Sequence, residues 1–282
     1  MNIKKIIPKD GPSIYEVEKY IKKYSNELIV VKAGGSVLLD ENLFNQFIED
    51  ITVINKLGLS AIVVHGGGKN IKKKLDKHNI ETKFINGLRV TDERTIKIVE
   101  EALLELNTEI LNNINDKEAN AQSVTPKNGN IIKIIPEKKE LGFVGTPKEV
   151  NKEVLLSIVR EKKIPIIVPL GIGDDEKIYN INADVAAAAI AKEINSRRLL
   201  LMTDVEGVLD KDKKLISEIN SETANNMIND QSISGGMIPK IKTCIDAVNN
   251  GVTGVVIVDG RRQNSILFEI FSDKGAGTLI RK

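Results

Sequence analysis

Five short apolar runs recur along the 282-residue chain, separated by longer stretches with helical periodicity. They are LIVVK (28–32), AIVVH (61–65), IPIIVP (164–169), LLLMTD (199–204) and GVVIVD (254–259). Uninterrupted runs of this kind are typical of strands buried on both faces, as in a parallel sheet covered by helices. The sequence therefore predicts an α/β fold, an open three-layer αβα sandwich with a mainly parallel central sheet.

The helices between these runs have recognisable ends. Residues 41–58 carry one apolar stripe and stop at Gly58, as a helix C-terminus would. The stretch 91–114 begins with Thr91 as the expected N-cap, followed by acidic residues that suit the helix dipole. The Ala-rich stretch 183–194 predicts a narrow helix that packs closely on the sheet.

Two segments depart from this alternation. Residues 115–153 mix Pro, Gly, Asn and Lys with short apolar runs, which predicts small antiparallel strands at the edge of the main sheet, with a lid or substrate-side hairpin as their use. Residues 12–27 predict a helix with Pro12 in its first turn. Its apolar stripe fits a helix packed on its own domain or an exposed oligomerisation helix, and both interpretations stay open.

Composition narrows the class of protein. The 41 Lys and Arg nearly balance the 39 Asp and Glu, aromatic residues make up 4% and Trp is absent, so nothing indicates a nucleic-acid surface. The single cysteine, Cys244, fits a reducing compartment and excludes a multi-cysteine metal site. Neither a signal peptide nor an apolar window of about 18 residues is found, so we expect a cytoplasmic protein without a membrane span.

Glycine clusters follow two of the apolar runs, in KAGGS (32–36) and HGGGK (65–69). Glycines at the carboxyl end of a parallel strand let backbone N–H groups approach an anion, although a plain tight turn explains either cluster alone. Lys32 stands at the end of a buried run, where its ammonium group needs an anionic partner. These features indicate a phosphate or carboxylate site. Neither cluster is GxxxxGK[ST] or GxGxxG, which excludes the standard nucleotide fingerprints and a dinucleotide-dependent oxidoreductase.

Polar residues follow other strands in the same way. In YNINADVAAA, Asn182 or Asp184 is the expected helix N-cap, and Asp184 is also placed to orient a lysine. In SGGMIPKIK, two glycines precede Lys240 at the start of another helix. The sequence thus predicts a second flexible loop that delivers a cation.

Together, KAGG, VVHGGG, NGLRVTDE, YNINADVAAA, TDVEGVLD and GGMIPK, in this order and spacing, resemble the motifs of the acetylglutamate kinases of the amino acid kinase superfamily. The resemblance runs from about residue 20 to the C-terminus. It implies transfer of the γ-phosphoryl group of ATP to the side-chain carboxylate of N-acetyl-L-glutamate, a step of arginine synthesis.

The resemblance also implies roles for particular residues. Gly67 and Gly68 would give N–H groups to a carboxylate of the substrate, Arg89 would grip its α-carboxylate, and Asn180 would bind the acetylglutamate. The catalytic set would be two lysines flanking the transferred phosphoryl group, an N–H donor to it, and an aspartate that holds the lysines: Lys32, Lys240, Gly35 and Asp184.

The nucleotide would bind residues at and after the end of the fourth apolar run, together with two serines of a later loop: Asp204, Val205, Gly207, Leu209, Ser232 and Ser234. Mg²⁺ would travel with ATP, and no dedicated metal site is expected. We expect residues 1–26 to form an N-terminal oligomerisation helix, 27–194 an acyl-substrate lobe and 195–282 a nucleotide-binding lobe.

Arginine-inhibited members of the family have an N-terminal helix that links dimers into a hexamer, and this chain is similar to them. The resemblance implies a homo-oligomer and a feedback site for L-arginine that includes Tyr20, Glu269 and Gly277. Asn264 stands where those enzymes usually have histidine. Other departures from the family pattern are Leu104 and Glu105, the stretch SVTPKNG, and Lys69 after HGGG.

Two alternative functions remain open. One is a sister kinase acting on an acylated or carrier-linked aminoadipate in lysine synthesis, because the atypical region 115–153 would select the acyl group. The other is a non-catalytic sensor of arginine or nucleotide. The presence of both lysines and Asp184 argues against a sensor, since a sensor needs no groups that stabilise a transition state.

Overall fold

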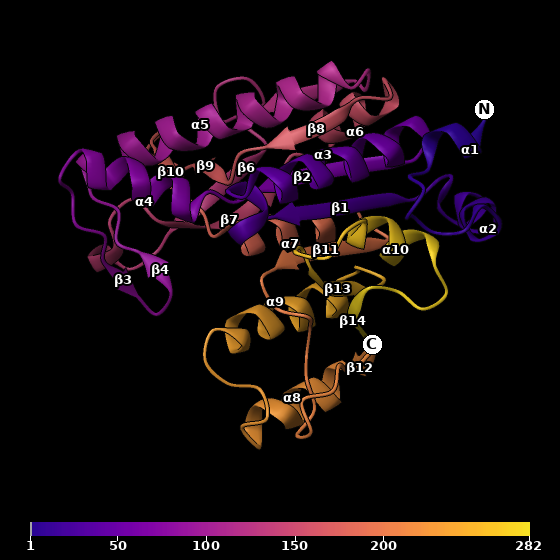
Figure 1. Ribbon diagram of the computed structural model, residues 1–282. Coiled ribbons are helices and arrows are strands. Elements are labelled where there is room, and N and C mark those ends of the chain that lie inside the picture. Colours follow the sequence, from indigo (N-terminus) through magenta and orange to yellow (C-terminus); the bar gives the residue numbers. More distant parts are fainter. Residues whose placement is uncertain (1) are drawn as a thin grey trace.

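The computed structural model describes residues 2–282 and is built around one eight-stranded sheet (Figure 1). The strands lie in the order β12-β14-β13-β11-β1-β2-β8-β5, and all neighbours are parallel except β13 and β14. Their bounds are β1 Leu28–Ala33, β2 Ser60–His65, β5 Ala121–Val124, β8 Ile164–Ile167, β11 Arg198–Thr203, β12 Glu218–Asn220, β13 Val255–Asp259 and β14 Gly277–Arg281. The five apolar runs all form strands, as the sequence predicts, and they lie next to one another in the order β13-β11-β1-β2-β8.

Helices cover both faces of this sheet, which confirms the three-layer architecture. In β1, Ile29 and Val31 point into one apolar core and Val30 into the other. The first core is closed by α2 Ile14–Tyr24, α3 Glu41–Lys56, α5 Glu93–Asp116 and α10 Ser265–Phe271. The second is closed by α6 Lys152–Arg160, α7 Ala183–Glu193, α8 Ser221–Asn229 and α9 Met237–Asn249. Uninterrupted apolar strands thus follow from burial on both sides.

Three helix ends test the expected capping. α3 ends at Lys56 and Gly58 has a φ of +80°, as predicted for a glycine after a helix. Thr91 is not the cap of α5. The N-cap is Asp92, whose carboxylate accepts from the Thr95 N–H at 2.7 Å, while the Thr91 hydroxyl donates to the carbonyl of Arg89. Carboxylate and hydroxyl oxygens both serve as caps, so the sequence alone does not choose between adjacent candidates.

The N-terminal helix α2 begins at Ile14, two residues later than predicted. Ser13 caps it, and Pro12 precedes the cap instead of lying in the first turn. Its Val17 and Tyr24 side chains are buried against the core that α10 completes, whereas Tyr15 is 78% exposed. The helix therefore packs on its own chain through one face and presents the other outward.

The region 115–153 differs from the prediction. β5 is a parallel strand of the main sheet, paired with β8 through a short polar segment that periodicity does not reveal. β6 Ile132–Pro136 and β7 Gly145–Val150 are antiparallel, but they belong to a second sheet with the order β10-β9-β6-β7. Its other strands are β9 Leu170–Ile172 and β10 Ile178–Asn180.

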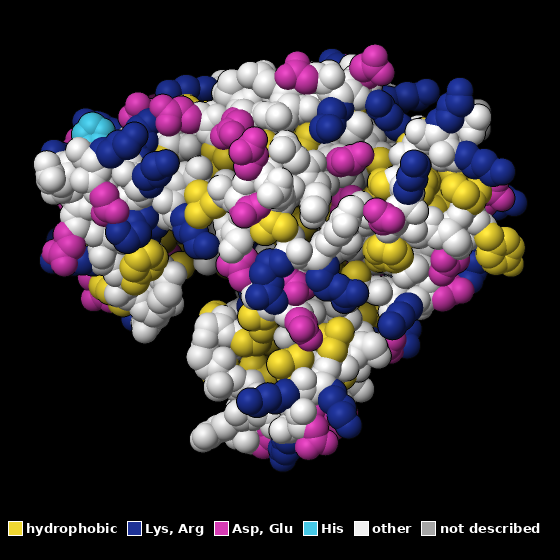
Figure 2. All heavy atoms as spheres, in the orientation of Figure 1, with side chains coloured by type: hydrophobic (Ala, Val, Ile, Leu, Met, Phe, Trp, Pro, Cys, Tyr) yellow, Lys and Arg dark blue, Asp and Glu magenta, His cyan; other side chains and the backbone are white. Residues whose placement is uncertain are grey.

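The remaining elements are short or lie at the ends of the sheet. They are α1 Ile3–Ile6, α4 Gly68–Lys77, the 3₁₀ helices η1 Gly35–Leu38 and η2 Lys139–Leu141, and a hairpin of β3 Phe84–Ile85 and β4 Leu88–Arg89. No helix within residues 2–282 is long and apolar enough to cross a membrane. Figure 2 shows a hollow between the part that carries α4 and the β3–β4 hairpin and the part that carries α8 and α9.

Candidate active site

A cavity lies beyond the carboxyl ends of β1 and β2, and we refer to it as the central cavity. Residues from β1, β4, β10 and the starts of α4 and α7 line it. Seven residues singled out from the sequence are among them: Lys32, Gly35, Gly67, Gly68, Arg89, Asn180 and Asp184. The fold thus brings together side chains that are up to 152 positions apart (184 − 32) in the chain. This is the edge of an open α/β sheet where ligands generally bind.

Two lysines share one carboxylate at this site. The Lys32 Nζ lies 2.9 Å from Asp184 Oδ1, an ion pair without hydrogen-bond geometry, and the Lys240 Nζ donates to Asp184 Oδ2 at 2.5 Å. The three side chains are 11%, 17% and 14% exposed for Lys32, Asp184 and Lys240. Burial alone would raise the pKa of Asp184, but the two ammonium groups hold it at about 2. The carboxylate is therefore ionised at neutral pH.

The start of α7 leaves Asp184 free for this task. Asn182 is the N-cap, because its side-chain oxygen accepts from the N–H groups of Asp184 and Val185 at 2.9 and 3.3 Å. The Asp184 carboxylate, no longer needed as a cap, turns toward the lysines. Lys240 reaches it from α9 and lies outside the lining of the central cavity.

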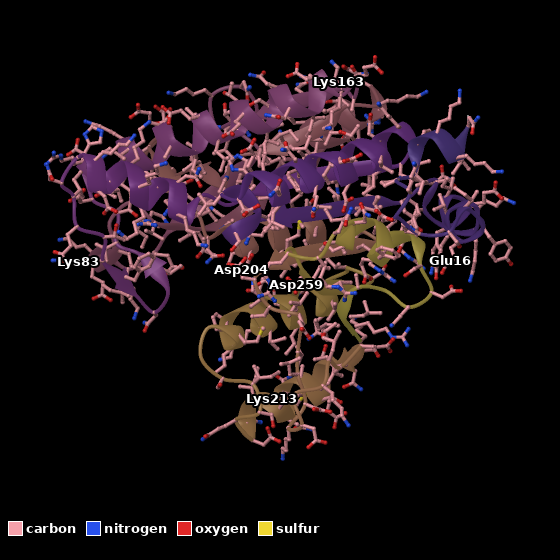
Figure 3. The ribbon with its side chains drawn as sticks, viewed as in Figure 1. Glu16, Lys83, Lys163, Asp204, Lys213 and Asp259 are labelled. Carbon is pink, nitrogen blue, oxygen red and sulfur yellow. The ribbon has the colours of Figure 1, made fainter. Side chains whose placement is uncertain are left out.

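The first glycine loop (residues 33–36) requires small residues for two reasons. A Cβ on Gly34 would lie 2.5 Å from the Lys32 Nζ, so a larger residue would displace the ammonium group from this position. Gly35 has a φ of +62°, and a Cβ there would lie 2.7 Å from the Asp204 carboxylate. That carboxylate accepts from the Ser36 N–H at 2.9 Å. Asp204, labelled in Figure 3, therefore lies against the first glycine loop.

The second glycine loop (residues 65–68) is packed on α5 and held by an arginine. A Cβ on Gly67 would lie 2.6 Å from Leu103 Cδ2, so the loop backbone lies directly on the helix. Arg89 is 7% exposed and donates to the Gly68 carbonyl at 3.0 Å, while the Phe84 ring centroid is 4.9 Å from its guanidinium carbon. Burial lowers the pKa of Arg89, which still leaves it charged.

Some residues of this site were not anticipated. Phe84 lines the central cavity and stacks on Arg89, yet it is one aromatic residue in the polar stretch TKFING, which carries no signal. Leu103, on α5, packs against Gly67. The periodicity of α5 predicts that Leu103 lies on its apolar face, but not which residue it contacts. The HGGG motif indicates a closely packed loop, but it does not indicate which side chains pack against that loop.

The residues expected to bind nucleotide lie in two segments after β11 in the chain. Asp204, Val205, Gly207 and Leu209 follow β11, and Ser232 and Ser234 lie between α8 and α9. None of them lines the central cavity. Val205 and Leu209 are 40% and 36% exposed, which leaves apolar surface available for a ligand.

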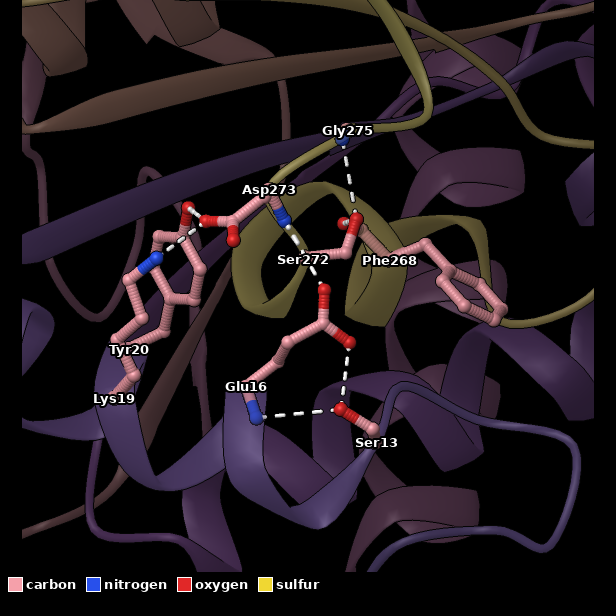
Figure 4. Close-up of polar contacts among 8 residues, drawn as sticks. All are labelled: Ser13, Glu16, Lys19, Tyr20, Phe268, Ser272, Asp273 and Gly275. Carbon is pink, nitrogen blue, oxygen red and sulfur yellow. Dashed lines mark hydrogen bonds and ion pairs between the residues drawn. The ribbon is translucent and has the colours of Figure 1, made fainter.

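A second cavity, the α2 cavity, lies between α2 and the segment that joins α10 to β14. Tyr20, Glu269 and Gly277 all line it, together with cationic and acidic side chains: Lys23, Arg198, Glu218, Asp273 and Lys274. Figure 4 shows how Asp273 is held, since its carboxylate accepts from the Tyr20 hydroxyl at 2.7 Å and pairs with the Lys19 Nζ at 2.6 Å. Burial and this hydrogen bond raise the pKa of Tyr20 to about 12.

Two further contacts place neighbouring residues. The partly buried Glu269 carboxylate accepts from the Ala276 N–H at 2.8 Å, and its burial raises its pKa. Asn264 does not line the α2 cavity. It has a φ of +53° before α10, and its side-chain amide donates to the carbonyl of Asp10 at 3.2 Å, which ties the N-terminal segment to α10.

No group of three or more His, Cys, Asp or Glu side chains with metal-binding geometry occurs within residues 2–282. Asp184, the carboxylate between the two lysines, is already neutralised by them. The donor set at this point suits an anionic group that approaches the lysines better than a bare divalent cation.

Comparison with known proteins identifies the family of this chain. A model of the amino acid kinase family matches residues 27–259. The acetylglutamate kinase of Pelagibacter ubique is 55% identical over 277 residues, 98% of this chain and 96% of that protein, and that of Clostridioides difficile is 45% identical over 275 residues, 96% of each.

Among solved structures, the N-acetylglutamate synthase of Neisseria gonorrhoeae, complexed with coenzyme A and N-acetyl-glutamate, has a TM-score of 0.85 at 21% identity. The match covers 95% of this chain but 62% of the synthase, so this likeness concerns the fold alone. The identities to the kinases extend over nearly the whole chain. The chain therefore belongs to the amino acid kinase family, and within it to the acetylglutamate kinases.

Proposed function

We propose that this protein transfers the γ-phosphoryl group of ATP to the side-chain carboxylate of N-acetyl-L-glutamate, forming N-acetyl-L-glutamyl 5-phosphate for arginine synthesis. The observation that carries the proposal is the Lys32–Asp184–Lys240 cluster, which adjoins a cavity containing Arg89 and two glycine loops. Phosphoryl transfer needs in-line positioning and cations around the moving group more than covalent chemistry from the protein.

The acyl substrate occupies the central cavity in this proposal. The Arg89 guanidinium has the fork geometry that suits an α-carboxylate, and Asn180 binds the acetylglutamate beside it. The N–H groups of Gly67 and Gly68 bind the side-chain carboxylate that is phosphorylated. Residues 27–194 thus serve as the acyl-substrate lobe.

The reaction needs no general base, because a carboxylate nucleophile is ionised at neutral pH. Lys32 and Lys240 neutralise charge on the transferred phosphoryl group from opposite sides, and the Gly35 N–H donates to it. Asp184 keeps both ammonium groups at one point before the phosphates arrive. His65 takes no part in proton transfer, since burial lowers its pKa to about 4.

ATP binds the lobe formed by residues 195–282, with Asp204, Val205, Gly207, Leu209, Ser232 and Ser234 around it. Mg²⁺ would come with ATP, and it would supply charge neutralisation on the phosphates beside Lys32 and Lys240. A cytosolic location suits both ATP as co-substrate and a protein whose single cysteine is a buried free thiol.

We also propose L-arginine as a feedback ligand of the α2 cavity. Glu218, Glu269 and Asp273 offer carboxylates for a guanidinium group, and Lys23 and Lys274 offer cations for a carboxylate. Residues 1–26 act as an oligomerisation segment, in which the outward face of α2 joins dimers into a hexamer. Tyr15, 78% exposed on that face, is an apolar contact for a second subunit.

The test of the main proposal is ADP release by the purified protein with Mg-ATP and a panel of acceptors. N-acetyl-L-glutamate is compared with N-acetyl-aminoadipate, glutamate and aspartate, each with and without arginine. Turnover confined to N-acetyl-L-glutamate is expected. Turnover with the aminoadipate derivative alone would indicate the sister kinase, and a protein that binds ATP without turnover of any acceptor would indicate a sensor.

A further inference from the structure

A chain of buried polar groups leads from the second glycine loop into the core. His65, the last residue of β2, is fully buried, and its Nδ1 lies 2.9 Å from the carbonyl oxygen of Gly66. Its Nε2 lies 3.1 Å from the side-chain amide nitrogen of Asn107 on α5. That amide nitrogen also donates to the Ile166 carbonyl at 3.0 Å, and the amide oxygen accepts from the Ser123 hydroxyl at 2.5 Å.

These contacts determine where the protons lie. The Ile166 carbonyl can only accept, so the nitrogen of the Asn107 amide faces it and donates to His65 Nε2 as well. Nε2 is then the unprotonated nitrogen of the ring, and Nδ1 carries the proton that it donates to Gly66. Burial lowers the pKa of His65 to about 4, which agrees with a neutral ring of one fixed tautomer.

The hydrogen bond from His65 fixes the direction of a peptide plane. The carbonyl of Gly66 and the N–H of Gly67 belong to one trans peptide, so they point in opposite directions. Because the carbonyl points to the buried ring, the N–H points away from it, and Gly66 and Gly67 both line the central cavity. The N–H of Gly66 is fixed too, by donation to the Ala33 carbonyl at 2.7 Å.

Glycine makes such an anchor necessary. Without a Cβ, the backbone of three consecutive glycines has many accessible conformations, and a turned peptide would present a carbonyl to the substrate instead of an N–H. Among residues 2–282, no carbonyl or side chain accepts from the Gly67 N–H. This group is therefore available to an anion in the central cavity.

We propose that His65 is a positioning residue for the acyl substrate: its imidazole, held by Asn107, turns the Gly66–Gly67 peptide so that the Gly67 N–H faces the substrate carboxylate. This inference rests on the proposed function, because it takes the central cavity as the N-acetyl-L-glutamate site. It adds residues that do not touch the substrate but decide whether the loop can bind it.

The test compares His65→Leu with His65→Asn in steady-state kinetics. Leucine cannot donate to Gly66, and we expect the KM for N-acetyl-L-glutamate to rise roughly ten- to hundredfold, the value of one hydrogen bond to a charged group. The KM for ATP should stay within about twofold, a difference of less than 1 kcal/mol. Asparagine keeps a donor at the δ position, so His65→Asn should restore most of the affinity for the acyl substrate.

A matched control separates positioning from general loss of stability. Ile110→Ala removes a fully buried side chain one turn from Asn107 on the same helix and destabilises the core without touching the loop. It should leave both KM values unchanged. The inference is overturned if Ile110→Ala raises the acyl KM as His65→Leu does, or if His65→Asn and His65→Leu behave alike.

Two further variants keep the outcome decisive. If His65→Leu does not fold, Ser123→Ala removes only the hydroxyl donor to Asn107, and a rise of roughly threefold in the acyl KM is expected; an unchanged KM would contradict the inference. Arg89→Ala is measured alongside. If Arg89→Ala raises the acyl KM and the His65 and Ser123 variants do not, this inference alone fails, whereas normal KM values in every variant would refute the acyl site itself.

Discussion

At the scale of single residues, the site depends on how one carboxylate is shared. Lys32 and Lys240 come from β1 and α9, and two ammonium groups this close would repel each other without Asp184 between them. Asp184 thus holds the two ammonium groups close together in the chain without substrate. In the proposed reaction, phosphate oxygens would take over part of the contacts that the carboxylate makes, so the lysines would need little rearrangement.

Arg89 gives a prediction that separates binding from chemistry. Arg89→Ala should raise the KM for N-acetyl-L-glutamate at least tenfold and change kcat much less, because the lost ion pair holds a part of the substrate that does not react. Steady-state kinetics with each substrate varied in turn measures both constants. A large fall in kcat at an unchanged KM would place Arg89 in the chemical step instead.

Sequence motifs predict the residues of the central cavity better than their partners. The residues Lys32, Gly67, Arg89 and Asp184 stand in motifs, and the fold brings all of them to one cavity. Phe84 and the link from His65 to Asn107 could not be predicted, because they depend on which face of a distant element meets the loop. Periodicity tells that α5 has a buried face but not what that face touches.

At the scale of elements, α10 depends on α3 for its first turn. The seven-residue helix has no side-chain cap of its own. Asp50, on α3, is 2% exposed and accepts from the Ile266 N–H at 3.2 Å, while its other oxygen has no partner within residues 2–282. Burial raises the pKa of Asp50 to about 8. A buried carboxyl therefore joins two helices of the same layer.

This join predicts a pH dependence of stability. The pKa of Asp50 is about 8 in the folded chain, against its ordinary value of 3.8. Folding therefore favours the protonated carboxyl. Its contribution to the free energy of unfolding is complete below pH 3.8 and is lost as pH rises from there through 8. Asp50→Asn removes the ionisation and should be more stable than the parent at pH 8.5, on the order of several kcal/mol, since each pKa unit between the folded and unfolded states is worth about 1.4 kcal/mol. The difference should shrink at pH 5. Urea unfolding at both pH values tests this, and parallel pH profiles for the two proteins would refute it.

Element boundaries show where local signals compete. The central strands and α3 follow the predicted pattern, since long apolar periods dominate there. The cap of α5 falls on Asp92 and the start of α2 on Ile14, because neighbouring polar residues are equivalent until tertiary contacts choose. β5 has only a weak apolar signal, because two of its four residues, Gln122 and Ser123, are polar. Backbone hydrogen bonds to β8 place it in the sheet.

At the scale of the whole molecule, one sheet runs through the two lobes that we propose. Residues 27–194 supply β1, β2, β8 and β5, residues 195–282 supply β11, β13, β14 and β12, and the two sets meet at the β1–β11 pair. The parallel orientation of the central strands was predictable, because their apolar runs indicate burial on both faces and helical stretches connect them. The second sheet was not, since its two local strand pairs, β6–β7 and β9–β10, are joined only through the β6–β9 contact between Lys133 and Ile172, which lie far apart in sequence.

We predict that the N-terminal segment that carries α2 joins dimers into a hexamer. Deleting residues 2–26 should reduce a hexamer to dimers, because it removes the proposed contact between dimers, and light scattering reports the mass. Since Val17 and Tyr24 of α2 are buried against the chain's own core, Tyr15→Glu is the gentler companion, changing a side chain that is 78% exposed. An unchanged mass in both variants would exclude α2 as the oligomer contact.

The most direct test of the account is kcat for Lys32→Ala and Lys240→Ala. Removing one electrostatic stabiliser of a transition state typically lowers kcat by about 10²- to 10³-fold, and we expect a loss of this size in each variant. Lys192→Ala, which removes a lysine paired with Asp246 on the surface, is the control and should keep normal turnover. Near-normal kcat in either Lys32→Ala or Lys240→Ala would contradict the assignment of the cluster to phosphoryl transfer.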